Sequence, residues 1–126
     1  MAGNEEPIRV VIVDDHPMMR NGIQAILATA RGVNVVGEPP SGEDAIAMCR
    51  TLRPQVVLMD LVMPGMGGVA ATQAIRRECP ETRVIVLTSF GDTSLVQDAV
   101  RAGAISYLLK NVTGSVLTEA VTAAAK

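Results

Sequence analysis

Apolar residues along the chain gather in five short runs separated by longer segments of mixed character. The runs start about 25 residues apart, the length that a strand, a helix of three turns and two short loops use together. They are IRVVIV at 8–13, VNVVGE at 33–38, QVVLMD at 55–60, RVIVLT at 83–88 and ISYLLK at 105–110. Because these runs do not alternate with polar residues, we expect strands buried on both faces, as in a parallel sheet.

The segments between the runs repeat apolar residues every three or four positions, which predicts helices with one buried face. Two of the predicted buried faces are Leu95, Val96, Ala99 and Val100, and Val116, Leu117, Ala120 and Val121. Pro17, Ser41 and Thr113 mark helix starts, while Gly32 and Gly103 mark helix ends. The alternation predicts an α/β domain with a doubly wound, five-stranded parallel sheet.

The totals agree with one globular domain. The chain has 126 residues, of which 48% are apolar and 19% charged, so it is neither disordered nor long enough for two full cores. The net charge of −2 gives no sign of a nucleic-acid-binding surface on this domain. Cys49 and Cys79 lack metal-ligand or disulfide spacing and are expected in the core.

The start of the chain, MAGNEEPI, is polar and acidic, unlike a signal peptide. No apolar stretch approaches the ~20 residues of a membrane span. We therefore expect a cytoplasmic protein that does not bind membranes.

Polar residues follow the predicted strands where these strands end. Asp14 and Asp15 follow the first strand, Asp60 ends the third, Thr88 the fourth and Lys110 the fifth. The carboxyl ends of parallel strands meet at one edge of a sheet, where open α/β folds bind their ligands. We expect these five side chains to converge there.

Such an edge is crowded with negative charge. Two carboxylates ~4 Å apart repel by about 4 kcal/mol at an effective dielectric of ~20, so three of them either stay partly protonated or bind a cation. Oxygen ligands with room for water favour Mg²⁺, and a metal beside a carboxylate, a lysine and a hydroxyl suits phosphoryl transfer. Taken singly, the acid pair also fits a helix cap or a solvated turn, Lys110 a surface lysine and Thr88 a strand-end hydroxyl.

The chain resembles the receiver domains of bacterial two-component response regulators over nearly its whole length, through IRVVIVDDHP, VVLMDLVMPGMGG, VIVLTS and SYLLK. DDHP, and LLK followed by a residue other than proline, look most like the receivers that precede LuxR-type DNA-binding domains. The resemblance implies a flavodoxin-like (βα)5 fold with strand order 2-1-3-4-5. It also implies one receiver domain over residues 1–126, with residues 1–7 as a flexible N-terminus.

The resemblance further implies the roles of the site residues. Asp60 would accept a phosphoryl group from a phosphohistidine of a sensor histidine kinase. Asp15, Asp60 and the backbone carbonyl of Val62 would bind Mg²⁺, or Mn²⁺, directly, and Asp14 would act through water.

Three further residues carry over from the family. Thr88 and Lys110 would each contact a phosphoryl oxygen, and Tyr107 would change rotamer as Thr88 moves. The product would be a conformation: the domain would catalyse only its own phosphorylation and dephosphorylation, and would be no enzyme in other respects. Phosphorylation could drive homodimerisation through the face of the fourth helix, fifth strand and fifth helix, or through the first and fifth helices.

The sequence departs from many receivers at three positions. Asn111 replaces the proline that often follows the lysine. Val62 and Phe90, each two residues beyond a site residue, are apolar where other receivers carry polar side chains that influence attack by water. We therefore expect slow loss of the phosphoryl group.

Two rival functions use a similar architecture. A phosphatase of the haloacid dehalogenase class needs an acid two residues beyond its nucleophile, and Val62 stands there. A flavin-binding electron carrier needs a phosphate loop where Asp14 and Asp15 lie. His16 is interpreted as a helix cap or a packed loop residue.

The last residues, VTAAAK, contain no capping glycine and no linker. The resemblance leads us to expect a helix-turn-helix output domain beyond this chain, which would bind DNA and control transcription. A regulator with a single domain is the alternative.

Overall fold

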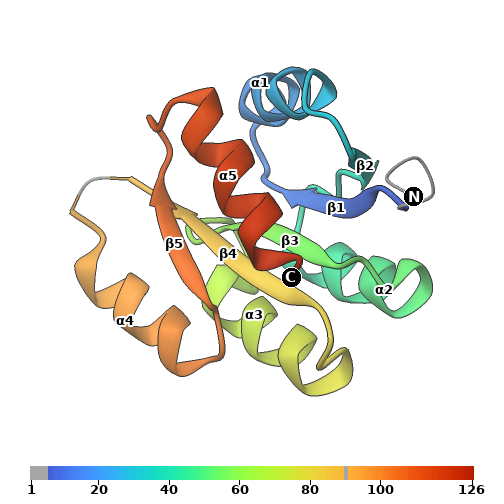
Figure 1. The fold of residues 1–126 in the computed structure, drawn as a ribbon. Coiled ribbons are helices and arrows are strands. Elements are labelled where there is room, and N and C mark those ends of the chain that lie inside the picture. The colour runs from blue at the N-terminus through green and yellow to red at the C-terminus, as the bar shows by residue number, and fades with distance from the viewer. Residues whose placement is uncertain (1–5, 90) are drawn as a thin grey trace.

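The computed structural model describes residues 6–89 and 91–126, which form one sheet flanked by helices (Figure 1). Residues 1–5 of the predicted flexible N-terminus, and Phe90, lie outside the described residues. The elements are β1 (Ile8–Val13), α1 (Pro17–Ala28), β2 (Val33–Gly37), α2 (Gly42–Leu52), β3 (Val56–Asp60), α3 (Gly67–Glu78), β4 (Arg83–Thr88), α4 (Thr93–Arg101), β5 (Ser106–Leu109) and α5 (Gly114–Ala124). Each apolar run therefore forms a strand, as predicted.

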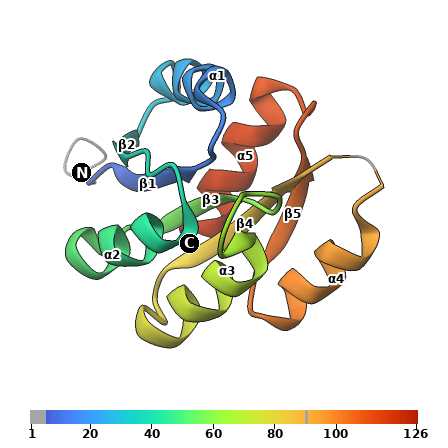
Figure 2. The same cartoon turned by 180° about the vertical axis from the view of Figure 1, so that it is seen from behind.

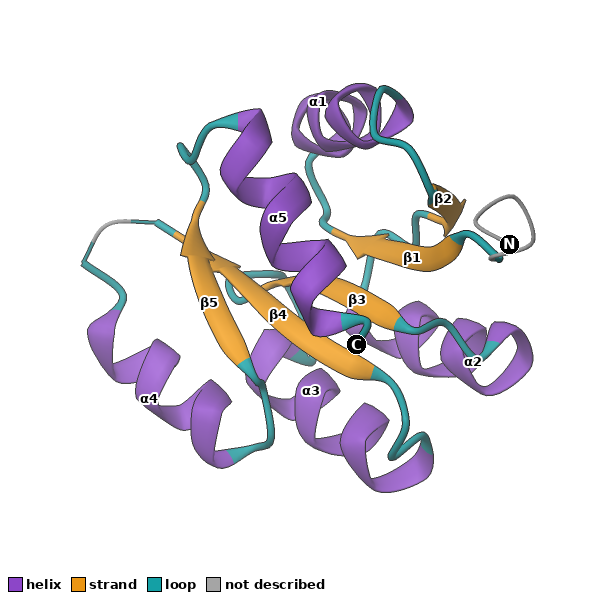
Figure 3. Cartoon of the chain, viewed as in Figure 1, coloured by secondary structure: helices purple, strands orange, loops and turns teal. Residues whose placement is uncertain are grey.

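The five strands are parallel and lie in the order β2-β1-β3-β4-β5, which confirms the predicted doubly wound sheet. Helices α1 and α5 cover one face, and α2, α3 and α4 cover the other (Figures 1 and 2). The loops at the carboxyl ends of β1, β3, β4 and β5 gather at one edge (Figure 3).

Alternate residues of each central strand enter two separate hydrophobic clusters. Val10 and Ile12 of β1 pack with the residues of α1 and α5, while Val11 and Val13 pack with those of α2, α3 and α4. All five residues of β3 are buried. This double burial explains the continuous apolar runs, because both faces of a central strand require apolar side chains.

The two edge strands, β2 and β5, are not buried on both faces, contrary to the prediction. Tyr107 of β5 is 54% exposed, and β2 contains no fully buried residue. The predicted burial of two helix residues is wrong as well, because Val100 of α4 and Val116 of α5 are exposed. Each sits at one margin of an apolar stripe, and only the centre of that stripe faces the sheet.

The predicted starts of α2 and α5 are confirmed by their capping hydrogen bonds. The Ser41 side chain accepts a hydrogen bond from the Asp44 N–H, and the Thr113 side chain accepts one from the Val116 N–H.

Gly103 follows the C-cap residue of α4 with a φ of 115°, in the left-handed region that favours glycine, so it marks this helix end as predicted. Gly32 also has a left-handed φ, 76°, but α1 ends at Ala28 with Thr29 as its C-cap, so the predicted helix end at Gly32 is wrong.

Cys49 and Cys79 are both buried free thiols in the core, as predicted. Burial, with a smaller contribution from Cys79, raises the pKa of the Cys49 thiol to about 12. Across residues 6–89 and 91–126, no helix combines the length and the apolar character that a membrane span requires.

Candidate functional site

The acidic residues meet because β1 and β3 are neighbours. Val13 pairs with Met59 in the parallel ladder, so Asp14 and Asp60 leave the sheet side by side. Both are buried, at 0% and 1% exposure. Single ligand atoms of Asp14, Asp15, Asp60 and His16 all lie within 4.8 Å of one another. We call these four residues the acidic cluster.

Lys110 completes the site from the fifth strand. Its backbone N–H donates to the Thr88 carbonyl, which extends the pairing of β5 with β4 to the sheet edge. The Lys110 Nζ lies 2.9 Å from Asp60 Oδ1 and 3.7 Å from Asp14 Oδ2. A largely buried ammonium therefore lies against both buried carboxylates.

The two carboxylate oxygens of Asp60 differ in their contacts within the described part of the chain: Oδ1 accepts hydrogen bonds and Oδ2 accepts none. Its Oδ1 accepts hydrogen bonds from Lys110 Nζ and from the Val62 N–H at 3.2 Å. Burial raises the pKa of the Asp60 carboxyl above its usual range; the Lys110 hydrogen bond opposes this shift, and the charge of Asp14 adds to it. The negative charge of the Asp60 carboxylate is thus only partly offset by the Lys110 ammonium.

Three buried oxygens of the cluster make no hydrogen bond within the part of the chain that the structure describes: Asp14 Oδ2, Asp15 Oδ1 and Asp60 Oδ2. Unsatisfied buried oxygens are expensive, and a hard divalent cation that accepts oxygen ligands satisfies several at once. The donor set therefore fits Mg²⁺.

His16 also borders these oxygens, which the sequence did not indicate. It occupies the N-cap position of α1, as one of its two interpretations proposed, but its side chain makes no capping hydrogen bond. The ring is 64% exposed rather than packed, and its Nδ1 lies 2.9 Å from Asp14 Oδ1 and 3.1 Å from Asp15 Oδ1. The short loop after β1 turns the ring back onto the acids.

Thr88 and Tyr107 lie at the same edge but outside these contacts. The Thr88 hydroxyl lies 3.1 Å from the Asp92 carboxylate and 3.3 Å from the Ser89 carbonyl, both acceptors beside α4. Thr88, Asp92 and Tyr107 line a cavity of about 420 Å³. Among the described residues, the Thr88 hydroxyl forms no hydrogen bond to the acidic cluster, and Asp92 is a contact that the sequence did not predict.

The raised pKa of Asp60 has a measurable consequence for stability. A carboxyl with a raised pKa in the folded state binds protons more tightly there than in the unfolded chain, so its charged form destabilises the fold. We expect Asp60→Asn to raise the free energy of unfolding at pH 7. The gain should shrink on acidification and vanish below the ordinary carboxyl pKa of 3.8.

Urea unfolding of both chains between pH 3 and pH 7 in a chelator checks this prediction. Asp98→Asn, an exposed substitution on α4, is the matched control and should change stability little. Excess Mg²⁺ should reduce the difference in free energy of unfolding between Asp60→Asn and the parent, because the cation stabilises the folded parent. A variant that is less stable than the parent at pH 7 would contradict the argument.

Comparison with known proteins agrees with this geometry. Residues 10–122 match the model of the response regulator receiver domain family. The chain is 44% identical over 119 residues to the transcriptional regulatory protein LiaR of Bacillus subtilis, covering 94% of this chain and 56% of LiaR. It is 44% identical over 114 residues to the response regulator VraR of Staphylococcus aureus, covering 90% of this chain and 54% of VraR. The chain thus spans about half the length of these curated relatives.

Solved structures give the same result. The signal receiver domain of NarL from Mycobacterium tuberculosis superposes with a TM-score of 0.91 at 36% identity, covering 96% of this chain and 98% of that one. A LuxR-family two-component response regulator from Aurantimonas gives a TM-score of 0.88 at 32% identity, covering 95% and 86%. With the acids, the lysine and the sheet order already in place, these matches show that the chain belongs to the receiver domain family of two-component response regulators, in its LuxR-type branch.

Proposed function

We propose that Asp60 is the phosphoacceptor of this receiver and takes its phosphoryl group from a phosphohistidine of a sensor histidine kinase. The observation that carries the proposal is the buried Asp60 Oδ2, which makes no hydrogen bond to residues 6–89 or 91–126, beside a lysine that holds the other oxygen. An Asp60 oxygen attacks phosphorus, an O–P bond forms, and the N–P bond breaks with its electron pair going to the imidazole. In-line transfer of this kind depends mainly on positioning and on charge stabilisation.

The residues around Asp60 have separate tasks in this reaction. Lys110 pairs with the oxygen charge that develops on the phosphoryl group, and the Thr88 hydroxyl donates to another phosphoryl oxygen. Asp15, Asp60 and the Val62 carbonyl would hold Mg²⁺ or Mn²⁺ directly, and Asp14 would act through water. When bound, the cation neutralises negative charge among the carboxylates and the phosphoryl oxygens.

The phosphoryl group acts by shifting a conformational equilibrium. It adds a charge of roughly −1.5 to −2, which draws Thr88 and Lys110 inward and favours a second arrangement of α4 and β5. Tyr107 shares a cavity with Thr88 and turns as that hydroxyl moves. A shift from 1:99 to 99:1 requires about 5.5 kcal/mol of differential interaction.

Loss of the phosphoryl group is expected to be slow. Val62 is 56% exposed and apolar, so its side chain cannot orient an attacking water molecule. We expect Val62→Asn to shorten the lifetime of the phosphorylated form by about tenfold, as positioned polar groups do in water-attack chemistry. The lifetime is measured by intact mass after the phosphodonor is removed.

The control for this experiment is Val62→Ile, which keeps position 62 apolar and β-branched and should leave the lifetime unchanged. An unchanged lifetime in Val62→Asn would contradict the role given to Val62. Phe90, the second apolar departure, lies outside the described residues.

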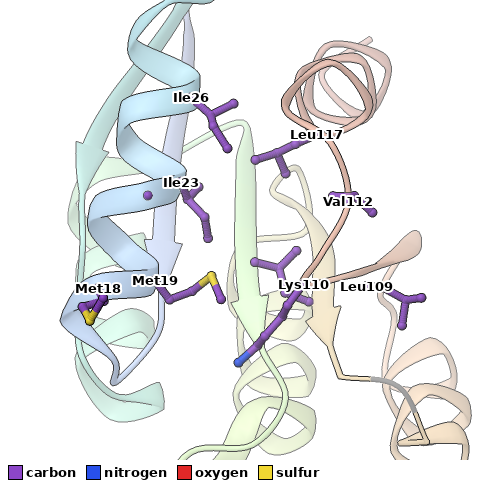
Figure 4. Close-up of a pocket in the computed structure, with 10 residues that line it drawn as sticks. Met18, Met19, Ile23, Ile26, Leu109, Lys110, Val112 and Leu117 are labelled. Carbon is purple, nitrogen blue, oxygen red and sulfur yellow. The ribbon is translucent and has the colours of Figure 1, made fainter.

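An apolar groove between α1 and α5 favours the first and fifth helices as a dimer interface. It has a volume of about 270 Å³, and Met19, Ile23 and Ile26 face Leu117 across it (Figure 4). Lys110 borders the groove, so a change at the phosphorylation site adjoins this face. We propose a homodimer that depends on phosphorylation. Equal sedimentation with and without acetyl phosphate would contradict it.

We propose that this receiver controls an output. That output is the control of transcription by a cytoplasmic regulator with a LuxR-type helix-turn-helix domain, because the match covers only 56% of LiaR and 54% of VraR. DNA binding then belongs to that domain and not to residues 1–126, whose net charge is −2. A single-domain regulator is the alternative.

Intact mass spectrometry after incubation with acetyl phosphate and Mg²⁺ tests the phosphoacceptor proposal. The parent should gain one phosphoryl group, and Asp60→Asn should gain none. The same samples with a small phosphomonoester distinguish the receiver from a phosphatase. Sustained release of phosphate over many turnovers would favour the phosphatase and overturn the proposal.

A further inference from the structure

The Asp92 carboxylate occupies a position from which it can serve two partners. It stands at the N-cap position of α4, where aspartate usually accepts hydrogen bonds from the first helical N–H groups. Its side chain makes no such bond here. Instead, Asp92 Oδ2 turns back toward β4 and accepts from the Thr88 hydroxyl at 3.1 Å and from the Ser89 N–H at 3.3 Å.

The Thr88 hydroxyl has only one proton, and its resting acceptors are Asp92 Oδ2 at 3.1 Å and, farther away, the Ser89 carbonyl at 3.3 Å. It cannot bond to Asp92 and to a phosphoryl oxygen at the same time. Both acceptors are charged, and hydrogen bonds to charged acceptors are about twice as strong as neutral ones. The resting contact therefore competes directly with the contact that the phosphorylated state needs. Thr88 is 2% exposed, which prevents water from easily replacing Asp92.

We propose that Asp92 is a positioning residue that holds the Thr88 hydroxyl on the α4 side in the unphosphorylated chain and caps α4 once the phosphoryl group takes that hydroxyl. The inference rests on the proposed function of Asp60 and adds a regulatory contact to it. It also links phosphorylation to α4, because Asp92 stands at the N-cap position of this helix. When Thr88 leaves, the Asp92 side chain is released from β4 and caps the first turn of α4.

The initial rate of phosphorylation by acetyl phosphate in Mg²⁺ tests the proposal in the full 126-residue chain. Asp92→Ala should react about fivefold faster than the parent, the factor that corresponds to the loss of about 1 kcal/mol from the resting state. Asp98→Ala removes the same charge from α4 and should react at the parental rate. Asp92→Asn retains a carbonyl acceptor and should fall between the parent and Asp92→Ala.

The Thr88→Val variant distinguishes two effects of removing Asp92: loss of its hydrogen bond to Thr88 and loss of its negative charge. In Thr88→Val, which has no hydroxyl to hold, adding Asp92→Ala should give no acceleration. Hydrogen exchange of the α4 peptide should slow on phosphorylation in the parent and not in Asp92→Ala.

Equal rates for the parent, Asp92→Ala and Asp92→Asn would overturn the proposal, and so would an acceleration that persists in the Thr88→Val background. If Asp92→Ala does not fold, the Asp92→Asn rate and the exchange of its α4 peptide decide. A parent that gains no phosphoryl group overturns the proposed function itself. A parent that gains one at the same rate as the Asp92 variants overturns only the role of Asp92.

Discussion

A Lys110→Ala variant is expected to accept a phosphoryl group from acetyl phosphate about 100-fold more slowly than the parent. The Lys110 Nζ lies 2.9 Å from Asp60 Oδ1, and its side chain is only 18% exposed. Removing a preorganised donor from a largely buried reacting centre slows such reactions by about 10²- to 10³-fold. Initial rates of mass gain at a fixed Mg²⁺ concentration provide the measurement.

Lys126→Ala is the matched control, because it removes the same charge from a position at the end of the chain, away from the site. Lys110→Arg should recover part of the rate, since it restores the charge without the point-like ammonium. A Lys110→Ala rate within a factor of about three of the parent would contradict the role of Lys110 in this reaction.

The second large effect concerns stability. We expect Gly68→Ala to lower the free energy of unfolding by about 3 kcal/mol, because overpacking against rigid neighbours falls at the high end of such costs. A Cβ at position 68 would overlap the Asp60 carbonyl oxygen and lie 2.7 Å from Leu61 Cα. Both are backbone atoms beside the proposed phosphoacceptor, so the chain must shift at the site itself.

Urea unfolding of Gly68→Ala and Gly22→Ala in parallel tests this expectation. Gly22 lies in the middle of α1, and a Cβ there meets no atom within 4 Å. The alanine at position 22 should stabilise the fold by about 1 kcal/mol through helix propensity. Similar unfolding midpoints for the two variants would contradict the close approach of α3 to Asp60.

The order of strands and helices could be predicted because two periodicities dominate this sequence. Runs such as VVLMD, at 56–60, are apolar at nearly every position since a central parallel strand is covered on both faces. The exposure of Tyr107 could not be predicted in the same way. It depends on which strand lies at the sheet edge, which is a property of the whole topology rather than of the local pattern.

The convergence of Asp14, Asp60 and Lys110 could also be predicted, because the rule about carboxyl ends of parallel strands turns sequence position into spatial position. The roles of these residues, and the Val62 carbonyl as a metal ligand, stay predictions. The contacts that were missed, His16 with the acids and Asp92 with Thr88, belong to loops. Their side-chain directions follow from backbone angles that the residue types leave open, such as φ −87° and ψ 40° at Asp92.

The most direct test of the account identifies the phosphorylated residue. After incubation with acetyl phosphate and Mg²⁺, the chain is reduced with borohydride, which converts an aspartyl phosphate to homoserine, and the peptides are mapped by mass spectrometry. The account predicts homoserine at position 60 alone, and none when a chelator removes the Mg²⁺. Homoserine at position 14 or 15, or an unmodified Asp60 in a folded chain with Mg²⁺ present, would contradict it.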